Sequence, residues 1–341
     1  MPDAFDATLS DYDYALPSEL IARWPTASRD GARMLQLGSE IAHKNVVDLP
    51  KTLREGDLLV VNDTKVMPAR VRARRSTGGA VEVFFLEEGE GVCRALVRPS
   101  KRLKVGESLT AGPYQIHLES RGTEGEWCVK PSVSSAQIMA EIGEMPLPPY
   151  LDRAEEAADK SRYQTVFADQ SGAVAAPTAS LHLSDALLQE LVERGVGLAK
   201  LTLHVGIGTF RNLRPSDLAN GELHPERFNV PQRCVDQIRA CRMRGGRVIA
   251  VGTTVTRTLE SATQPGERVP EAGEGVTRLF LREGARFSCV DGLMTNFHLP
   301  RSSLLMLVCA FAGRERVLSA YAEAISQEYR FYSYGDSMLI L

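Results

Sequence analysis

The sequence has few cysteines, and none of them stands in a metal-binding or disulfide pattern. Its 341 residues include six cysteines, with no CxxC pair and no histidine at ligand spacing beside them. This spacing argues against a zinc site and against a disulfide framework. We therefore expect reduced thiols and no bound metal. The six are Cys93, Cys128, Cys234, Cys241, Cys289 and Cys309.

Long apolar runs and a basic leader are also missing. The longest apolar run, residues 304–312, is far shorter than the roughly 20 residues that span a bilayer. The first residues, MPDAFDATLSDYDYALP, are acidic and lack the apolar core of a secretory signal. We expect a cytoplasmic protein without membrane contact.

Neither sign of charge is in large excess. Forty basic and 43 acidic residues give a net charge of −3, so nucleic-acid binding would require a local basic patch. With 43% apolar and 24% charged residues, the composition is that of a globular protein. Disordered, collagen-like and coiled-coil classes are excluded, and the length fits one large domain or two.

Two patterns divide the chain. Between residues 57 and 144, short β-rich runs alternate with glycine-containing turns, which predicts a small antiparallel barrel or sandwich. The runs are DLLVVN, ARVRAR, AVEVFFLE, CRALVR and YQIHLES. The following MPLPPYL, residues 145–151, holds three prolines and fits a rigid boundary.

Helices and strands alternate after this boundary. The order predicts an α/β unit with mostly parallel strands, open or barrel-like. Expected helices start near Ser184, Pro231, Thr254, Ser303 and Glu315, and expected strands cover 198–205, 247–252, 290–297 and 336–340. Residues 153–162 and 265–275 are expected to be solvated loops.

The first 50 residues show turns and short helices without a core of their own, so the β-rich region is interpreted as an insertion. We expect a discontinuous large α/β domain, residues 1–56 and 151–341, and a small β-barrel domain, residues 57–150.

A basic patch lies in the β-rich region. Residues 65–104 contain ten Lys or Arg and four Glu, a net charge of +6. Arg70, Arg72 and Arg74 alternate along one expected strand, so their side chains share a face that suits phosphate oxygens. The same stripe is also typical of a charged, solvated edge strand.

Three glycine- and threonine-bearing segments follow expected strands: GAVAAPTASLH, TLHVGIGTF and AVGTTVTRTLES. In α/β folds such turns hold ligands, and helix starts accept anions, although equally many are only structural. Gly206 and Gly208 lack the third glycine of the dinucleotide fingerprint, because residue 211 is Arg. A nicotinamide cofactor is therefore disfavoured.

Several polar residues stand in apolar surroundings. His182, His204 and His298 lie near expected loop ends, as do Asn296 and Asp336. One such histidine is usually a hydrogen-bonded core residue, but several together favour acid–base chemistry. The aromatic segment YRFYSYGD near the end of the chain fits base stacking and core filling equally well.

Together these motifs resemble the S-adenosylmethionine:tRNA ribosyltransferase-isomerase family of queuosine biosynthesis. The sequence motifs that carry this resemblance are distributed over nearly the whole chain: DYDYALPSELIA, VVNDTKVMPAR, MPLPPYLDR, GAVAAPT, TLHVGIGTF, LHPERFNV, RVIAVGTT, VDGLMTNFHLPRSSLLMLVCAFAG and YRFYSYGDSM. Departures include Ser180, where the family usually has glycine, and Leu183.

The resemblance implies a large barrel-like α/β unit with an inserted small β-barrel. It implies transfer and isomerisation of the ribosyl part of S-adenosylmethionine onto 7-aminomethyl-7-deazaguanine at the wobble position of tRNA. The product is epoxyqueuosine, and adenine and methionine leave. The expected partner is an anticodon stem-loop with a GUN-type wobble guanine derivative. Beyond S-adenosylmethionine as co-substrate, we expect no cofactor, and we expect a monomer.

Residue types and motif positions then suggest three groups. The candidate catalytic residues are His182, His204, His298 and Glu226. The candidate substrate-binding residues are Thr178, Thr209, Arg257, Asn296, Asp336 and Tyr332. The candidate tRNA-binding residues are Arg70, Arg72, Arg74, Lys101 and Arg102.

Two other functions remain open from the residues. An α/β isomerase or lyase for a small anionic metabolite would use the glycine–threonine turns but leave the arginine stripe idle. A catalytically inactive tRNA-binding homologue is compatible with Ser180 and Leu183.

Overall fold

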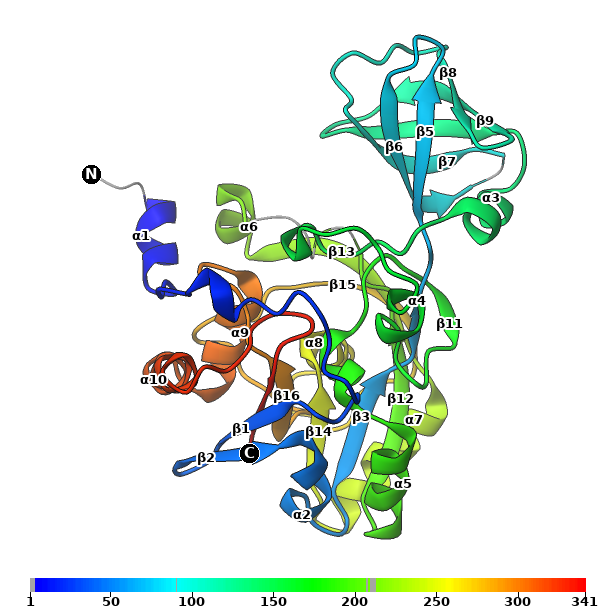
Figure 1. Cartoon of the computed structure of the whole chain (residues 1–341). Helices are drawn as coiled ribbons and strands as arrows, with labels where there is room; N and C mark the ends of the chain where they lie inside the picture. Colours follow the sequence, from blue (N-terminus) through cyan, green and yellow to red (C-terminus); the bar gives the residue numbers. More distant parts are fainter. Residues whose placement is uncertain (1–3, 90, 207, 209–212) are drawn as a thin grey trace.

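The computed structural model describes residues 4–89, 91–206, 208 and 213–341. It contains a nine-stranded mixed sheet and a closed six-stranded antiparallel barrel (Figure 1). The predicted α/β class and the small antiparallel barrel are confirmed. In spatial order the large sheet consists of β15 (Gly273–Leu279), β13 (Glu222–Val230), β12 (Gly197–Leu203), β3 (Leu58–Asn62), β14 (Val248–Val251), β16 (Gly292–Asn296), β17 (Ser337–Ile340), β1 (Arg33–Leu37) and β2 (Ile41–Asn45).

The centre of this sheet is parallel. Strands β12, β3, β14 and β16 run in one direction, and every residue of β3, β14 and β16 is buried, as expected for strands covered on both faces. The expectation of mostly parallel strands holds for this centre and is wrong at the sides. There β13 and β15 pair antiparallel, as do β16 with β17 and β1 with β2.

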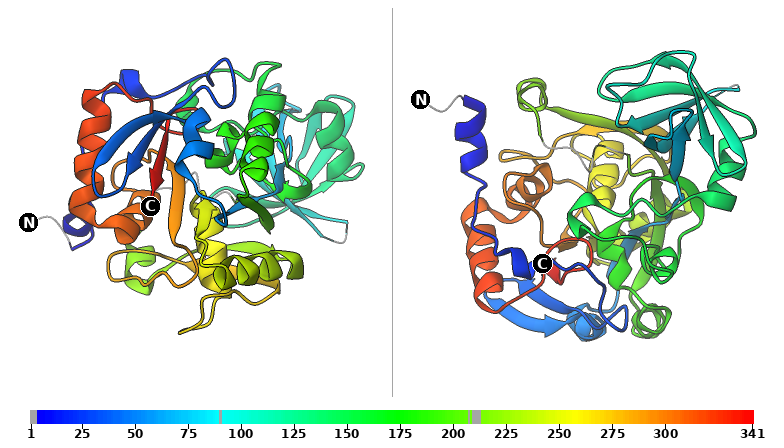
Figure 2. Two further views of the ribbon diagram at one scale, coloured as in Figure 1. Left: turned by 90° about the horizontal axis from the view of Figure 1, so that it is seen from below. Right: turned by 45° about the horizontal axis from the view of Figure 1, so that its top comes forward.

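Helices cover both faces of the sheet (Figure 2). Leu58 and Val60 of β3 face a core shared with α7 to α10, whereas Leu59 and Val61 face a core shared with α2 and α5. The helices are α1 (Ala4–Ser10), α2 (Leu49–Thr52), α3 (Ser135–Ile142), α4 (Asp159–Arg162), α5 (Asp185–Glu193), α6 (Pro215–Asn220), α7 (Gln232–Met243), α8 (Thr253–Ala262), α9 (Ser303–Ala312) and α10 (Arg314–Ser326).

The predicted helices are all present, and Ser184 caps α5 by accepting a hydrogen bond from the Leu187 amide at 3.2 Å. Short 3-10 helices complete the set: η1 (Ser18–Leu20), η2 (Val46–Asp48), η3 (Pro149–Leu151) and η4 (Thr178–His182). Within the described ranges, no helix has the length and apolar character needed to cross a membrane.

Four strands of the large sheet were not predicted. Strands β1 and β2 lie in the first 50 residues, where we expected turns and short helices. Strand β13 contains Pro225, and β15 begins inside the segment 265–275 that we expected to be a loop. Strands β2, β13 and β15 are partly exposed, and their burial follows no regular period of two, so the alternation that signals a strand is missing. The expected loop 153–162 also ends in α4.

The six barrel strands enclose their own apolar core. In order around the barrel they are β10 (Glu126–Pro131), β7 (Cys93–Arg98), β6 (Ala80–Glu88), β5 (Arg70–Arg75), β8 (Ser108–Ala111) and β9 (Tyr114–Arg121). The run at 57–62, which we expected in this small domain, forms β3 at the centre of the large sheet instead. A run that is apolar on both faces fits a doubly covered parallel strand better than a barrel strand, whose residues alternate.

A two-stranded ladder is formed by the segments that connect the large sheet and the barrel along the chain. It pairs β4 (Thr64–Val66), which follows β3 and precedes the barrel, with β11 (Gln170–Ala173), which follows the barrel. The chain therefore enters and leaves the barrel beside the end of β3.

Candidate functional site

The carboxyl ends of the parallel strands define the candidate site. Strands β3, β12, β14 and β16 end at one edge of the sheet, and β3 leads from this edge toward the barrel (Figure 1). Ligands of open α/β sheets bind outside this edge. Many residues singled out from the sequence follow directly on these strands or lie on segments packed against them.

Asn62, the last residue of β3, holds this edge together. Its Oδ1 accepts hydrogen bonds from the amides of Thr64 (3.1 Å) and Leu203 (3.0 Å). Its Nδ2 donates to the Leu203 carbonyl at 2.9 Å and reaches the Thr254 hydroxyl at 3.4 Å. One buried amide thus fixes the ends of β3 and β12 and the first turn of α8 relative to one another.

His204 follows β12 and lies beside the start of β4. Its Nδ1 is 2.9 Å from the Thr64 hydroxyl, and the side chain is half-buried. Burial lowers the pKa of His204, and the nearby Asp63 carboxylate opposes this effect. The imidazole is therefore neutral at pH 7, the form in which it can accept a proton.

Asp63 supplies a buried carboxylate next to this histidine. It is 8% exposed, burial raises its pKa, and the Thr202 hydroxyl donates a hydrogen bond to it at 2.7 Å. Asp63, Thr64 and Asn62 were not among the sequence candidates. The signal was present, because the polar run Asn-Asp-Thr follows directly on the apolar run LLVV.

A second cluster joins Asn296, His182 and Tyr332. The Asn296 Nδ2 donates to the Tyr332 carbonyl at 3.0 Å and lies 3.1 Å from the His182 Nε2. A carbonyl only accepts, so this contact fixes the orientation of the amide. His182 Nε2 must then be the acceptor, which places the ring proton on Nδ1.

The amide oxygen of Asn296 is left without a donor. Asn296 is 2% exposed, and its Oδ1 has no hydrogen-bond partner among the described residues. An unmatched buried acceptor costs on the order of 1–3 kcal/mol. A ligand N–H or O–H group would remove that cost.

Tyr332 stacks against Tyr150 next to this cluster, with ring centroids 4.4 Å apart. Its φ of 73° is positive, a conformation uncommon for a bulky residue and found preferentially at functional sites. The residue as a whole is only 8% exposed. Tyr332 therefore fills space against Tyr150, and stacking on a base stays a prediction.

Arg257 and Glu226 form a buried ion pair between α8 and β13. Glu226 also accepts a hydrogen bond from the Gly206 amide at 3.0 Å, and the Arg257 Nε donates to the Leu279 carbonyl at 3.0 Å. The Arg257 Nη2 is buried and has no partner in the described part of the chain. Each carboxylate oxygen thus accepts one hydrogen bond, whereas one edge of the guanidinium has no partner among the described residues.

Two other candidates, His298 and Asp336, form hydrogen bonds that hold parts of the protein together. The His298 Nε2 lies 2.8 Å from the Thr295 hydroxyl, inside the protein. Asp336 accepts hydrogen bonds from the amides of Arg33 (2.9 Å) and Arg330 (2.8 Å) and so ties β1 to the last loop. In this structure Asp336 therefore stabilises the contact between these two segments.

The remaining substrate candidates lie in glycine-bearing turns. Thr178 opens η4, the segment that ends at His182. Ser180, also in η4, is fully buried and its φ is not positive, so the backbone at this position does not require glycine. The Ser180 hydroxyl has no partner among the residues described. Thr209 lies outside the described residues.

The two buried histidines predict a pH dependence of stability. Burial lowers the pKa of His182 to about 4 and that of His298 to about 3, against about 6.5 in an unfolded chain. Between pH 6.5 and 4 the unfolded state therefore binds protons that the folded state does not, so the free energy of unfolding falls as the pH falls.

Replacing His298 by Gln should remove about one of these protons and flatten the slope by about 1.4 kcal/mol per pH unit. Urea unfolding between pH 8 and 4.5 measures this. Above pH 7 the wild-type and variant curves should run parallel, and unchanged slopes below pH 6 would contradict the assignment.

The candidate tRNA residues divide into two groups. Arg70, Arg72 and Arg74 share the outer face of β5, as predicted. However, Arg70 lies 3.4 Å from a Glu82 carboxylate oxygen, and Arg72 binds Glu144 with both arms at 2.6 and 3.1 Å. Two of the three guanidinium charges are therefore offset within the protein.

Three cations remain without a carboxylate. Arg74 donates to the Gly78 carbonyl at 3.4 Å, and Lys101 and Arg102 are exposed between β7 and β8. None of the three has an ion pair in the described ranges. They are the strongest phosphate-binding candidates of the set.

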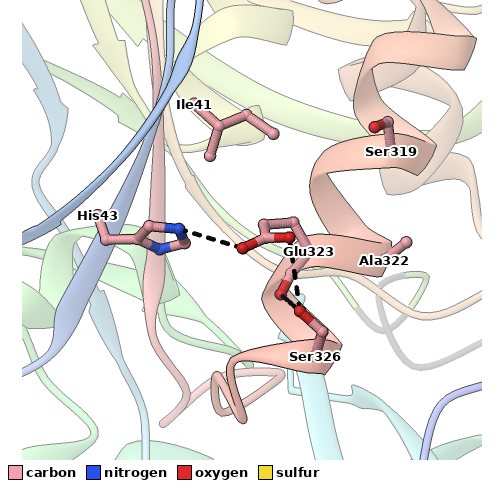
Figure 3. A pocket seen from close by; sticks show the side chains of 6 residues that line it. All are labelled: Ile41, His43, Ser319, Ala322, Glu323 and Ser326. Carbon is pink, nitrogen blue, oxygen red and sulfur yellow. Dashed lines mark hydrogen bonds and ion pairs between the residues drawn. The ribbon is translucent and has the colours of Figure 1, made fainter.

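A groove of about 470 Å³ lies elsewhere, between β2 and α10 (Figure 3). In it the His43 Nε2 lies 3.4 Å from a Glu323 carboxylate oxygen. None of the candidate site residues lines this groove. Its lining residues are Ile41, His43, Ser319, Ala322, Glu323 and Ser326.

The fold and the site define an α/β protein that gathers a neutral histidine, buried carboxylates and unmatched polar atoms at the carboxyl ends of parallel strands. A family model described as queuosine biosynthesis protein matches residues 9–340. The chain belongs to this family, and the family predicted from the sequence is confirmed.

Curated relatives match over nearly their whole length. A protein of Trichlorobacter lovleyi is 46% identical over 344 residues, covering 98% of this chain and 99% of the relative. One of Synechococcus elongatus is 47% identical over 354 residues, covering 100% and 98%. Both are named S-adenosylmethionine:tRNA ribosyltransferase-isomerase.

A solved structure is also similar. The crystal structure of S-adenosylmethionine tRNA ribosyltransferase from Thermotoga maritima has 36% sequence identity and a TM-score of 0.56. It covers 97% of this chain and 100% of that chain.

Proposed function

We propose that this chain transfers and isomerises the ribosyl group of S-adenosylmethionine onto 7-aminomethyl-7-deazaguanine in tRNA. The product is epoxyqueuosine-tRNA, with release of adenine and methionine. The observation that carries the proposal is the full-length identity of 46–47% to enzymes with this name. The reaction expected from the sequence and the names of these relatives agree.

The chemistry needs a base. A sulfonium acidifies the neighbouring 5′ C–H, and the aminomethyl group must be uncharged to act as a nucleophile. A neutral imidazole with a free lone pair can take either proton and become imidazolium. We assign this part to His204, because it is half-buried, whereas His298 is buried against Thr295 and His182 Nε2 already accepts from Asn296.

We assign the carboxylate of S-adenosylmethionine to Arg257. Its Nη2 is a buried charged donor without a partner in the described part of the chain, and guanidinium groups bind carboxylates in good geometry. Glu226 holds the guanidinium in place by its ion pair. The Asn296 Oδ1 is then available to accept from a ribose hydroxyl or from the adenine amino group.

Replacing Arg257 by Lys tests this assignment. Lysine retains a charge for Glu226 but has no second arm. A hydrogen bond to a charged group contributes about 1.5–3 kcal/mol, so KM for S-adenosylmethionine should rise by about 10- to 100-fold. Decarboxylated S-adenosylmethionine should be a poor substrate for the wild type, and Arg257→Lys should discriminate between the two substrates far less.

Arg247→Lys is the matched control. Arg247 pairs with buried Asp57 at 2.6 Å, at the opposite edge of the sheet. This variant should keep the wild-type discrimination between the two substrates. If folded Arg257→Lys still discriminated between S-adenosylmethionine and its decarboxylated form as strongly as the wild type, the assignment of the substrate carboxylate to Arg257 would be wrong.

The reaction itself is tested with purified protein, S-adenosylmethionine and an anticodon stem-loop bearing the aminomethyl base. Chromatography should show free adenine, and mass spectrometry should show the added ribosyl-derived group on the RNA. RNA binding without adenine release would instead identify an inactive homologue. Absence of both would favour a small-metabolite enzyme.

A further inference from the structure

We propose that Thr64 and Gly172 form a clamp that fixes the ring and the tautomer of His204, presenting its Nε2 as the lone-pair nitrogen. This inference rests on the proposed function for its catalytic meaning. Thr64 and Gly172 are positioning residues: they act through His204. Neither was named as a site residue from the sequence, although Gly172 opens the segment GAVAAPTASLH that was singled out there.

The first half of the clamp is the Thr64 hydroxyl. Thr64 is fully buried, and its Oγ1 lies 2.9 Å from His204 Nδ1 and 3.4 Å from the Gln170 carbonyl oxygen. The hydroxyl has one proton. If it donates to the carbonyl, its oxygen accepts the Nδ1–H of the ring, and both contacts are hydrogen bonds.

This arrangement determines the tautomer. With the proton on Nδ1, the Nε2 of the neutral ring carries the lone pair and can accept a proton from the substrate. In the other tautomer the hydroxyl would donate to Nδ1, and the Gln170 carbonyl would lose this donor. A base whose second nitrogen is held by an orienting group is the recurring arrangement of general-base catalysis.

The second half of the clamp is the backbone at Gly172. A Cβ at this position would lie 2.7 Å from His204 Nδ1 and 2.8 Å from Cε1, and φ is +150°. No side chain fits there without displacing the ring. Gly172 belongs to β11, which pairs with β4 so that Gln170 is opposite Thr64. One short ladder therefore carries both halves of the clamp.

Two charged groups act on the ring. Asp63 favours the imidazolium form, and Arg227 disfavours it. Asp63 is itself held by Thr202 at 2.7 Å. Loss of the Thr64 hydroxyl leaves these charges in place, so its effect on the pH profile reports the hydrogen bond to Nδ1.

The test compares Thr64→Val, which removes the hydroxyl while keeping the branched shape, with Thr64→Ser, which retains it. Thr64→Val should lower kcat by about 10- to 100-fold, the range typical of lost orienting contacts, leave KM for S-adenosylmethionine within about twofold, and shift the pH profile of kcat/KM. Thr64→Ser should restore most of the rate. Gly172→Ala should lower kcat through displacement of the ring.

Thr52→Val is the matched control. Its hydroxyl bonds the Asp48 carbonyl at 3.0 Å in α2, at the far end of the molecule from the barrel (Figure 1). This variant should keep the wild-type kcat and pH profile.

A second readout needs no turnover. Nitrogen-15 NMR of histidine-labelled protein, with the His204 signal assigned from His204→Gln, should show a protonated Nδ1 in the wild type and a changed tautomer ratio in Thr64→Val. A wild-type His204 protonated on Nε2 overturns the clamp even if Thr64→Val fails to fold.

The two proposals fail in different ways. A wild type that releases no adenine refutes the proposed function, while the NMR signal still decides the clamp. An active wild type together with a folded Thr64→Val of unchanged rate and tautomer refutes the clamp alone.

Discussion

Replacing His204 by Ala is expected to lower kcat by about 10²- to 10⁴-fold, the usual contribution of a general base. The reason is the position of this ring, half-buried at the carboxyl end of β12, neutral at pH 7 and held at Nδ1 by Thr64. Single-turnover release of adenine from S-adenosylmethionine, with saturating stem-loop RNA, measures the step directly. RNA affinity and the unfolding midpoint should remain near wild type.

His43→Ala is the matched control, because His43 lies in the groove between β2 and α10 and faces Glu323 (Figure 3). Its rate should equal that of the wild type. A folded His204→Ala that keeps more than about a fifth of the rate would exclude this residue as the base. Asp63→Asn would then be the next variant to measure, because that carboxylate is buried beside His204.

The second large effect is expected in RNA binding. Removing Arg74, Lys101 and Arg102 together by Ala substitution should weaken binding of any anticodon stem-loop. Each lost phosphate contact should flatten the plot of log affinity against log salt by about 0.7 to 0.9, so the slope should change by about 2 to 3. Selectivity for the aminomethyl base should survive, because phosphate contacts carry no base information.

Two comparisons make this result specific. Arg70→Ala with Arg72→Ala should change the slope much less, because Glu82 and Glu144 already offset these charges. A triple Ala change at Lys51 on α2, Arg194 directly after α5 and Arg239 on α7 controls for net charge, because these helices lie at the other end of the molecule (Figure 1). Equal slopes in all folded variants would place the RNA surface outside the barrel.

Part of the site was predictable because chemistry-bearing residues follow strands. His204, Asn296 and Arg257 were found in this way, and the structure places all three at or near the carboxyl edge of the sheet. Asp63 and Thr64 follow the same rule after β3. They were missed because the run LLVV was assigned to the barrel. The rule that ligand-binding residues follow the carboxyl ends of strands applies to parallel α/β sheets and not to a small antiparallel barrel.

The sequence by itself determined the α/β class, the small antiparallel barrel, most helices and the family, because these depend on local periodicity and on long motifs. Only the tertiary structure decided the place of β3, the difference between the three histidines and the pairing of Arg72. Thr64 and His204 are 140 positions apart, and Arg72 and Glu144 are 72 apart. Burial and hydrogen bonding between such distant residues arise only when the chain is folded, and they decide which nitrogen is a base and which charge is free to bind a phosphate.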